Sequence, residues 1–504
     1  MNPNLTDSAV DKKTLRFVIG ASSLGTLIEW YDFYIFGTLT VIIGKEFFPA
    51  DSPSAQLLAA LAAFAAGFLV RPFGAIVFGR MGDLLGRKYT FLLTLVLMGL
   101  STVAIGCVPN FKSIGFAAPI IILLLRLIQG LALGGEYGGA ATYVSEHTDA
   151  SRRGFYTSWI QTTATLGLFL ALAVIYFTKK SIGEAEFSTW GWRIPFWISA
   201  ILLAVSVFIR LKMAESPMFA KIKAEGKVSK NPLKESFGNK LNFKYVLLAL
   251  FGATMGQGVI WYTGQFYANA FLQNTMKIED GQRTSLMLLA IALATPFFII
   301  FGAWSDRVGR KWIMMVGMAI AVCAYFPIYQ QMLNTGDVSL KTVMTEKSFK
   351  TVIIQADEIN KIDSLRTSSS SVAYTDETVI TEVKKEKILN NHNISKSETS
   401  KKVYLSSRNW WKNMWLVWIQ IIFVTMVYGP IAAFLVELFP TRIRYTSMSL
   451  PYHVGNGIFG GLTPFVATAL SVTGYLNGLW YPVLIGGFCC LIGFLFLSNK
   501  VSEE

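Results

Sequence analysis

The sequence predicts an all-α membrane protein of twelve transmembrane helices, arranged as two similar six-helix halves. Hydrophobic residues make up 53% of the 504 residues and charged residues only 15%, and the mean hydropathy is +0.47. Soluble domains carry about 25% charged residues, so this composition is typical of a chain with many membrane spans. The two other supporting observations are recurring apolar runs of about 20 residues and a pair of motifs that occurs once in each half.

The apolar runs are long enough to cross a bilayer as helices. In lipid every backbone polar group must be hydrogen-bonded within its own structure, so spans are helices or a closed barrel. Barrel strands would appear as short alternating segments, which these runs are not. The expected spans cover residues 16–43, 56–79, 89–108, 114–143, 156–177, 192–211, 245–272, 285–304, 312–333, 413–436, 446–470 and 476–497.

Two polar segments interrupt the spans and set the expected domain boundaries. Residues 1–211 form an N-terminal six-helix half and residues 245–504 a C-terminal one. The link between them, 212–244, has eight Lys against three Glu and is expected in the cytoplasm. The second polar segment, 334–412, is an insert between spans nine and ten with 13 basic and 10 acidic residues.

Basic residues in the short loops predict the orientation of the chain in the membrane. The loops after spans two, four, eight and ten all fall on the side of the N-terminus, so both termini are expected in the cytoplasm. Long loops translocate largely regardless of charge, so the 334–412 insert is placed outside. Its low hydrophobicity favours a disordered loop over a small strand-containing cap. The basic loop residues are Arg80, Arg87, Lys88, Arg152, Arg153, Arg307, Arg310, Lys311, Arg442 and Arg444.

The two halves share sequence motifs at the same positions. "GRMGDLLGRK" (79–88) and "GAWSDRVGRK" (302–311) both read G-x-x-x-D-x-x-G-R-K. A second pair of motifs closes spans four and ten, with an acid and an Arg seven residues apart in each. The residues expected to form a cytoplasmic gate are Gly79, Asp83, Gly86, Arg87, Lys88, Glu146, Arg153, Asp306, Gly309, Arg310, Lys311, Glu437 and Arg444.

The repeated motifs suggest a gate made of ion pairs between helix ends. Asp83 is expected to pair with Arg153 or Arg87, and its counterpart Asp306 with Arg444 or Arg310. Such pairs are made in one conformation and broken in another. The alternative is that the basic residues merely keep these loops inside. Basic residues alone would do that, whereas the repeated Asp and Gly positions favour the gate.

These motifs carry a resemblance to a known family. The chain resembles the major facilitator superfamily and, within it, the metabolite:proton symporters, which include carriers for osmoprotectants, α-ketoglutarate, citrate and shikimate. The resemblance implies the major facilitator fold and proton-coupled transport, and it covers nearly the whole chain except the insert. The resembling stretches are "GTLIEWYDFYIFG" (25–37), "RPFGAIVFGRMGDLLGRK" (71–88), "RLIQGLALGGEYGGA" (126–140) and "SRRGFYTS" (151–158).

Span one carries two acids in an otherwise apolar and aromatic run. Glu29 and Asp32 are three residues apart, so they share one face of a helix. In the second half "VIWYTGQFY" (259–267) aligns with "IEWYDFYIF" (28–36), and Ile260 and Thr263 replace the acids. An acid at mid-membrane costs about 2.5–3.5 kcal/mol on insertion scales. The fold does not require these acids, so we expect them to be functional.

The acids predict proton coupling, with a nearby cation as partner. Arg71 in span two and Arg126 in span four are the candidate counter-charges or substrate anchors. A carboxyl group that alternates between an apolar environment and an Arg neighbour can load and release a proton. The alternative is a fixed structural ion pair between helices. Glu136 is a second proton-site candidate or a packing residue, and the remaining candidates for substrate contact are Gln129, Gln257, Trp261, Tyr262 and Gln265.

The predicted function is proton-coupled symport of a small polar metabolite by alternating access, in the cell membrane. Two intramembrane Arg favour a carboxylate or zwitterion as substrate. The alternatives are proton-coupled efflux, sugar or facilitative transport, and a transporter-like sensor. The sequence contains no catalytic constellation, nucleotide loop, metal-ligand cluster or cofactor motif, so we expect no enzyme. The expected partners are the substrate, protons and lipid, without nucleic acid, and a monomer suffices for the mechanism.

Overall fold

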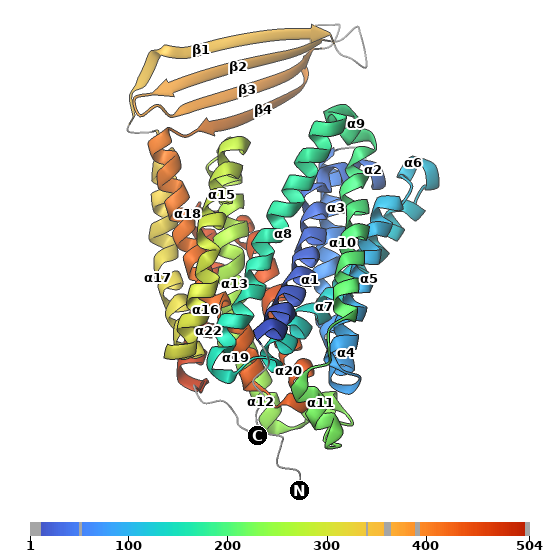
Figure 1. Ribbon diagram of the computed structural model, residues 1–504. Helices are drawn as coiled ribbons and strands as arrows, with labels where there is room; N and C mark the ends of the chain where they lie inside the picture. Colours follow the sequence, from blue (N-terminus) through green and yellow to red (C-terminus); the bar gives the residue numbers. More distant parts are fainter. Residues whose placement is uncertain (1–11, 50–52, 339–340, 357–363, 389–393, 499–504) are drawn as a thin grey trace.

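The computed structural model describes residues 12–49, 53–338, 341–356, 364–388 and 394–498 (Figure 1). The chain ends, for which the sequence analysis predicts a cytoplasmic location, lie outside the described residues. The chain folds as a helical bundle with a small sheet at one end. We call that end the sheet end. The opposite end carries both G-x-x-x-D-x-x-G-R-K motifs, and we call it the motif end.

The N-terminal half comprises ten helices and two short 3-10 turns. The helices are α1 (Lys12–Thr38), α2 (Thr40–Phe47), α3 (Pro53–Leu69), α4 (Arg71–Leu84), α5 (Arg87–Cys107), α6 (Phe111–Ile114), α7 (Ala117–Glu146), α8 (Arg153–Ile182), α9 (Glu184–Thr189) and α10 (Ile194–Leu211), and the 3-10 turns are η1 (Ala150–Arg152) and η2 (Gly191–Arg193).

The link contains α11 and the π-helical turn η3, and the C-terminal half follows. The elements are α11 (Pro217–Ala224), η3 (Lys234–Gly238), α12 (Lys240–Ala249), η4 (Leu250–Thr254), α13 (Met255–Tyr262), η5 (Thr263–Tyr267), α14 (Ala268–Ala270), η6 (Phe271–Thr275), α15 (Asp280–Ala294), α16 (Pro296–Val308), α17 (Arg310–Gly336), α18 (Ser407–Tyr428), α19 (Ile431–Leu438), η7 (Thr441–Ile443), α20 (Arg444–His453), η8 (Val454–Gly460), α21 (Gly461–Ser471), η9 (Asn477–Leu479) and α22 (Trp480–Phe496).

The helices confirm the fold class that the sequence predicts. Within the described residues, ten continuous helical stretches are long and apolar enough to cross a membrane. The helices α1 and α2, bent by 63° at the break between them, together form one further candidate span. The expected span 446–470 is also helical and comprises α20, η8 and α21, but it carries more polar residues than the other spans. The twelve-helix bundle is therefore complete.

The two halves meet at the motif end and separate toward the sheet end (Figure 1). At the motif end, α4 packs on α20 and α16 packs on α8, and each of these contacts joins opposite halves. The apolar core follows the same division. One large cluster of buried residues fills the C-terminal half, and a smaller cluster around α1, α7 and α10 fills the sheet-end part of the N-terminal half.

The insert between α17 and α18 forms a four-stranded antiparallel sheet in the order β1-β2-β3-β4. This differs from the favoured expectation of a disordered loop and matches the less favoured one. Low hydrophobicity prevents a packed core, but strands joined by short connections satisfy their backbone groups by pairing with their neighbours. The strands are β1 (Val343–Ala356), β2 (Ser364–Tyr374), β3 (Val379–Ile388) and β4 (Ile394–Tyr404).

The root of the sheet is fastened to the C-terminal half. Val403 of β4 donates its N–H to the Lys277 carbonyl at 2.8 Å, and its own carbonyl accepts from the Glu279 N–H at 2.9 Å. Gln282 of α15 exchanges two hydrogen bonds with the backbone of Leu405, at 2.8 and 3.1 Å. The sheet is therefore attached to the C-terminal half (Figure 1).

Candidate functional site

Asp32 of α1 is buried and held by hydroxyl groups rather than by a cation. Its side chain is 2% exposed. Oδ1 accepts a hydrogen bond from Ser199 Oγ of α10 at 2.6 Å, and Oδ2 accepts one from Thr102 Oγ1 of α5 at 2.9 Å. Neither predicted partner, Arg71 or Arg126, forms a direct ion pair with Asp32 in the described part of the chain. The carboxyl group is therefore fixed in place without direct charge compensation.

A chain of hydrogen bonds connects Asp32 indirectly to Arg126. Thr102 Oγ1 accepts from Gln129 Nε2 at 2.6 Å, and Gln129 Oε1 accepts from Arg126 Nη1 at 2.7 Å. Gln129 and Arg126 lie on one face of α7, three residues apart. Arg126 is thus connected to Asp32 through the neutral side chains of Gln129 and Thr102. The other N–H groups of Arg126 are available to other partners.

The two intramembrane arginines lie against aromatic rings. The Arg71 guanidinium carbon is 4.2 Å from the centre of the Phe68 ring, and that of Arg126 is 4.2 Å from the Phe36 ring. Cation–π contacts of this kind stabilise a desolvated guanidinium without neutralising it. The Nε atoms of Arg71 and Arg126 are buried and have no hydrogen-bond partner among the residues that the structure describes. Each guanidinium therefore keeps at least one N–H group unpaired.

A buried ion pair lies beside α1, one turn from Glu29. Arg210 Nη2 of α10 contacts Glu136 Oε1 of α7 at 2.6 Å, and each side chain is 1% exposed. Thr94 Oγ1 donates to the second Glu136 oxygen at 2.8 Å. A Cβ at Gly25 would collide with the Arg210 guanidinium, so glycine at this position lets the cation approach α1. Glu136, which the sequence offers as a second proton site or a packing residue, is thus part of an ion pair.

Glu29 lies buried between these charged groups without a direct partner. It is 8% exposed, and its Oε2 atom has no hydrogen bond. It interacts electrostatically with Glu136, Arg71 and Arg210, but no ion pair to any cation forms among the described residues. Buried charges are normally paired or neutralised, so an unpaired carboxyl group here calls for a chemical role.

The C-terminal half faces these acids with aromatic and amide side chains. Trp30 of α1 and Trp261 of α13 occupy equivalent positions in the two halves, and their ring centres are 5.6 Å apart. Tyr262 packs edge-on against Trp261 at 4.8 Å. Gln257, one turn from Trp261, is fully buried, and its Oε1 accepts from Asn456 Nδ2 at 2.7 Å. Repeat-related helices therefore meet at one aromatic contact.

Several polar atoms around this contact are buried and have no hydrogen-bond partner in the described part of the chain. Buried polar groups in proteins are almost always hydrogen-bonded, so each unpartnered atom needs an explanation. Such atoms come from both halves, which is expected of a site that a polar ligand would complete. They are Glu29 Oε2, Arg71 Nε, Arg126 Nε, Gln257 Nε2, Trp261 Nε1 and His453 Nε2.

A cavity of about 570 Å³ lies between the halves on the sheet-end side of the tryptophans. Tyr34 of α1 and Gln265 of η5 line it, each one helical turn beyond Trp30 and Trp261. Asn269 and Arg283 line its outer part and hydrogen-bond to each other at 2.5 Å. Among the predicted substrate contacts, Gln265 reaches this open cavity, whereas Gln257, Trp261 and Tyr262 are buried beneath it.

Tyrosines from both halves close the path on the motif-end side. Tyr137 of α7 stacks on Tyr452 of α20 with ring centres 3.7 Å apart. The Tyr452 hydroxyl is 2.8 Å from that of Tyr428, and Gln161 Nε2 donates to the Tyr137 hydroxyl at 2.9 Å. This stack joins the two halves and contributes to the closed motif end.

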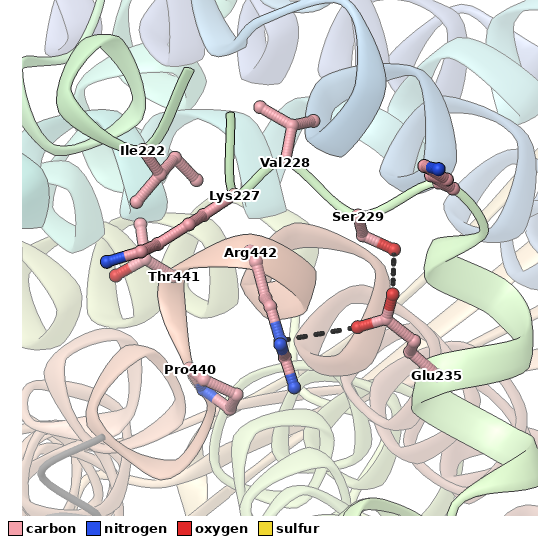
Figure 2. A pocket seen from close by; sticks show the side chains of 9 residues that line it. Ile222, Lys227, Val228, Ser229, Glu235, Pro440, Thr441 and Arg442 are labelled. Atoms are coloured by element: carbon pink, nitrogen blue, oxygen red, sulfur yellow. Dashed lines mark hydrogen bonds and ion pairs between the residues drawn. The ribbon is translucent and has the colours of Figure 1, made fainter. Parts of the chain in front are cut away.

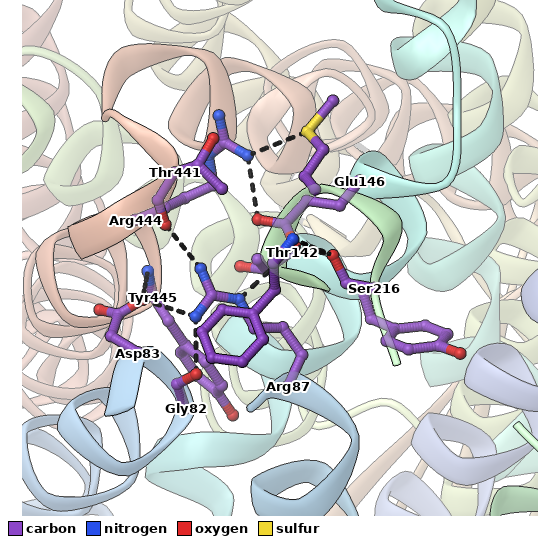
Figure 3. A network of polar contacts seen from close by, with 12 residues as sticks. Gly82, Asp83, Arg87, Thr142, Glu146, Ser216, Thr441, Arg444 and Tyr445 are labelled. Atoms are coloured by element: carbon purple, nitrogen blue, oxygen red, sulfur yellow. Dashed lines mark hydrogen bonds and ion pairs between the residues drawn. The ribbon is translucent and has the colours of Figure 1, made fainter. Parts of the chain in front are cut away.

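At the motif end, each repeated aspartate binds the start of a helix in the opposite half. Asp83 accepts the backbone N–H groups of Tyr445 and Thr446 of α20, at 3.3 and 2.8 Å (Figure 3). Its counterpart Asp306 accepts those of Gly154 and Phe155 of α8, both at 2.8 Å. Helix N-termini attract negative charge because their N–H groups are unpaired. Both aspartates therefore connect the two halves, and they do so in equivalent ways.

The second pair of motifs forms ion pairs that also cross between the halves. Glu146 Oε1 contacts Arg444 at 3.0 Å, and its other oxygen lies 3.5 Å from Arg87 (Figure 3). In the mirror arrangement, Glu437 contacts Arg153 at 3.4 Å and Arg310 at 3.1 Å. Each glutamate therefore binds one arginine of its own half and one of the other.

The structure decides between the ion-pair alternatives for the gate residues. Asp83 pairs with Arg87 at 2.9 Å, and Asp306 pairs with Arg310 at 2.7 Å. The other expected partners, Arg153 and Arg444, bind the glutamates instead, so the expectation that they pair with the aspartates is not met here. The reason is geometric, because the aspartate oxygens already accept hydrogen bonds from backbone N–H groups at the start of a helix in the opposite half.

The remaining motif residues shape the two equivalent turns. Gly86 has φ +126° and Gly309 has φ +103°, backbone conformations that residues with a Cβ rarely adopt. Lys88 Nζ donates to the Leu211 carbonyl at 3.0 Å, and Lys311 Nζ donates to the Leu497 carbonyl at 2.7 Å. Each lysine thus binds the end of the last helix in its own half. Gly79 packs closely against Thr446.

Sequence reasoning missed several residues of this site. Arg210 lies at the end of span six, where basic residues normally mark a cytoplasmic loop, and only its spatial neighbours distinguish it. The tyrosine stack carries no signal either, because single tyrosines in apolar helices are more often packing residues. Ser199 and Thr102 carry no signal because serine and threonine are common in membrane helices. Among the described residues, no three His, Cys, Asp or Glu side chains are grouped to hold a metal ion.

Comparisons with known proteins agree with this architecture. A family model described as "Sugar (and other) transporter" matches residues 17–245. The α-ketoglutarate permease of Escherichia coli K12 is 29% identical over 494 residues, which cover 98% of this chain and 96% of that protein. The proline/betaine transporter of the same strain is 33% identical over 329 residues, covering 64% of this chain and 65% of that protein. The chain therefore spans about two thirds of that relative's length in the alignment.

Solved structures of the proton:xylose symporter XylE share the fold. The form bound to 6-bromo-6-deoxy-D-glucose covers 98% of each chain with a TM-score of 0.65 and 16% identity. The inward-open form of XylE from E. coli matches with a TM-score of 0.55. The chain therefore shares the fold of these major facilitator superfamily structures, in line with the resemblance that its motifs carry.

Proposed function

We propose that this protein is a proton-coupled symporter of a small carboxylated or zwitterionic metabolite. The observation that carries the proposal is the Glu29 carboxyl group. It is buried, lacks a partner for one oxygen and adjoins the Trp30–Trp261 contact between the halves. The equivalent residue of the C-terminal half is Ile260, so the acid is not needed for the fold. A group of this kind, free to gain or lose a proton as its surroundings change, is what coupling requires.

Two carboxyl groups of α1 share the proposed proton chemistry. Glu29 lies near Arg71 and the Glu136–Arg210 pair, so movement of either cation would change its charge state. Asp32 is connected to Arg126 only through hydrogen bonds, so motion in α7 reaches it through Gln129. We assign Glu29 and Asp32 as proton carriers and Glu136 as the fixed partner of Arg210.

The aromatic and cationic surroundings support a substrate with a carboxylate. Arg71 has a free Nε and suits bidentate binding of a carboxylate. The Trp30 and Trp261 rings offer faces on which a cationic group of a zwitterion can lie. Both classes of substrate appear in the relatives, one named for α-ketoglutarate and the other for proline and betaine. The residues proposed to contact substrate are Arg71, Arg126, Gln129, Gln257, Trp261, Tyr262 and Gln265.

The proposed cycle moves the two halves, 1–211 and 245–504, about the central site, with the 212–244 link joining them. Positive residues in the short loops favour a cytoplasmic motif end, which places the insert and the open cavity outside. Substrate then enters through the cavity beside Tyr34 and Gln265. Release to the cytoplasm requires Asp83 and Asp306 to leave their helix starts, and the Glu146 and Glu437 pairs to break.

The test uses purified protein in proteoliposomes. A thermal-shift screen of carboxylates and zwitterions identifies a substrate, and uptake is then measured with and without an imposed pH gradient. We expect Glu29→Gln and Asp32→Asn to lose gradient-driven accumulation, and at least one of them to keep exchange at equal pH. The matched control is Glu184→Gln, an exposed acid of α9 far from the site. If both variants accumulate substrate as the control does, the proton assignment is wrong.

A further inference from the structure

A second pocket lies at the motif end, outside the transport path. Its volume is about 620 Å³, and it is formed between the link and the loop that precedes α20 (Figure 2). One wall comes from residues 222–235 of the link, and the other from Pro440, Thr441 and Arg442. The pocket exists because the link lies against the C-terminal half in this conformation.

Five of the nine lining residues carry a cation or a hydroxyl group. Lys227, Lys230 and Arg442 supply three positive charges, and Glu235 supplies the one negative charge among the lining residues. Ser229 and Thr441 add hydroxyl groups. Lys227 is also paired with Glu225 at 2.8 Å, which leaves a net charge of about +1 around the pocket. A concave site with this charge and several donors matches a phosphate group better than a cationic ligand.

Glu235 already places an anionic group against Arg442 in this pocket. Its Oε1 accepts from Ser229 Oγ at 2.6 Å, and its Oε2 lies 3.3 Å from Arg442 Nε (Figure 2). That Oε2 atom has no hydrogen-bond partner. An incoming phosphate can take over the contact with Arg442 while Ser229 retains Glu235. The carboxylate is therefore an internal competitor for the anion.

The walls of the pocket are tied to the gate. Arg442 is two residues before Arg444, which binds Glu146 across the halves. On the link side, Ser236 shares a hydrogen bond at 2.8 Å with Ser447 of α20. A ligand that touches both walls would therefore hold the link against α20 in the conformation in which the motif end is closed.

We propose that this pocket binds a phosphate-bearing anion, and that its occupancy stabilises the closed motif end. A ligand shifts a conformational equilibrium by its difference in affinity for the two states. Separation of the two walls would remove the site, so binding favours the closed state. This pocket is separate from the proposed transport site, and its test requires no transported substrate.

The binding test pairs two neighbouring substitutions with opposite expected effects. Arg442→Gln removes the main cation and should weaken binding at least tenfold. Glu235→Gln removes the competitor and should strengthen binding severalfold. Lys223→Gln, an exposed residue of the same link that does not line the pocket, is the control for loss of one positive charge. Binding is measured by calorimetry and thermal shift on the purified full chain.

Two arms separate a free phosphate from a lipid headgroup. The first adds inorganic phosphate or pyrophosphate in neutral detergent, against chloride at equal ionic strength. The second compares nanodiscs of phosphatidylglycerol with nanodiscs of phosphatidylcholine. Binding in the first arm that depends on Arg442 identifies a soluble anion as the ligand. Stabilisation confined to phosphatidylglycerol and dependent on Arg442 identifies a lipid. Absence of an effect in both arms, or equal effects in Arg442→Gln and Lys223→Gln, overturns the site.

The conformational part has its own readout. Spin labels at cysteines introduced by Arg80→Cys and Arg307→Cys, two exposed positions at the motif end of opposite halves, report the separation of the halves. We expect the bound anion to increase the population with the short distance, and Arg442→Gln to abolish this increase. If the anion binds without changing the distance distribution, the proposed stabilisation of the closed state is wrong.

Discussion

The two halves share a fold and a set of gate motifs but differ at their equivalent first helices. In α1, Glu29 and Asp32 are both buried, and Glu29 interacts electrostatically with the buried Glu136–Arg210 pair. In the corresponding α13–η5 segment, Ile260 and Thr263 stand at the same positions, and Thr263 is satisfied by the Val259 carbonyl at 2.6 Å. The repeat thus keeps the motifs at the motif end and differs at these buried positions of the first helix. Around this site the charged side chains belong to the N-terminal half, whereas the C-terminal half contributes neutral polar and aromatic contacts.

The largest effect is expected from breaking the buried Glu136–Arg210 ion pair of the N-terminal half. Arg210→Gln leaves Glu136 as an unpaired buried charge and should reduce stability by about 3–5 kcal/mol. The double variant Arg210→Met with Glu136→Leu removes both charges and should recover most of that loss. Unfolding in detergent, followed by intrinsic fluorescence, measures both. Equal stability of the single and double variants would mean that the pair contributes no charge compensation.

The next largest effect follows from placing an acid in the half that lacks one. Ile260→Glu puts a carboxyl group at the position equivalent to Glu29, but no Arg of the C-terminal half is described near it. The insertion cost of about 2.5–3.5 kcal/mol should therefore appear as lost stability. Ile260→Gln, which has similar size without charge, should cost less at neutral pH. If Ile260→Glu is as stable as the wild type, the C-terminal half can compensate acids and the contrast between the halves fails.

The two gate aspartates provide a comparison in which the halves are nearly equal. Asp83 is fully buried and Asp306 is 8% exposed at its side chain. Asp83→Asn and Asp306→Asn each remove charge from a helix start, which is worth about 1–2 kcal/mol in partly buried geometry. Both should open the motif end, with a larger shift for Asp83→Asn. The spin-label distance between positions 80 and 307 measures the populations, and no shift in either variant would contradict their role as locks.

The smallest effect is expected at the aromatic contact that joins the equivalent helices. A double-mutant cycle of Trp30→Ala and Trp261→Ala isolates the energy between the two rings. Offset or tilted aromatic pairs contribute about 0.5–1.5 kcal/mol beyond area burial. A coupling energy in that range, measured by unfolding, supports direct contact in solution. Strict additivity would place the two rings apart in the dominant conformation.

Most of the fold could be predicted from the sequence because membrane spans are local features. Apolar length identifies each helix, and the repeated motifs identify the two halves. The α20–α21 region was also found, although it is more polar than the rest. The sheet was the main miss. Its low hydrophobicity indicated disorder, whereas pairing between strands and attachment at Val403 order it without a core.

The candidate site was only partly predictable, because its contacts join residues far apart in the chain. The acids of α1 stood out against their apolar neighbours, and the gate residues stood out by repetition. Partners did not. Asp32 bonds to Ser199 and Thr102, and neither hydroxyl carries a signal in one sequence. Arg210 resembled a loop residue, and the exchange of partners between gate aspartates and glutamates depends on how the halves pack.

The central claim is that the acids of α1 carry protons together with substrate. The most direct test measures both fluxes at once, with labelled substrate and a pH-sensitive dye inside proteoliposomes that have no initial pH gradient. An inward substrate gradient should acidify the lumen with wild-type protein. Glu29→Gln or Asp32→Asn should move substrate with little or no acidification. Unchanged proton flux per substrate in both variants would contradict the assignment of coupling to α1.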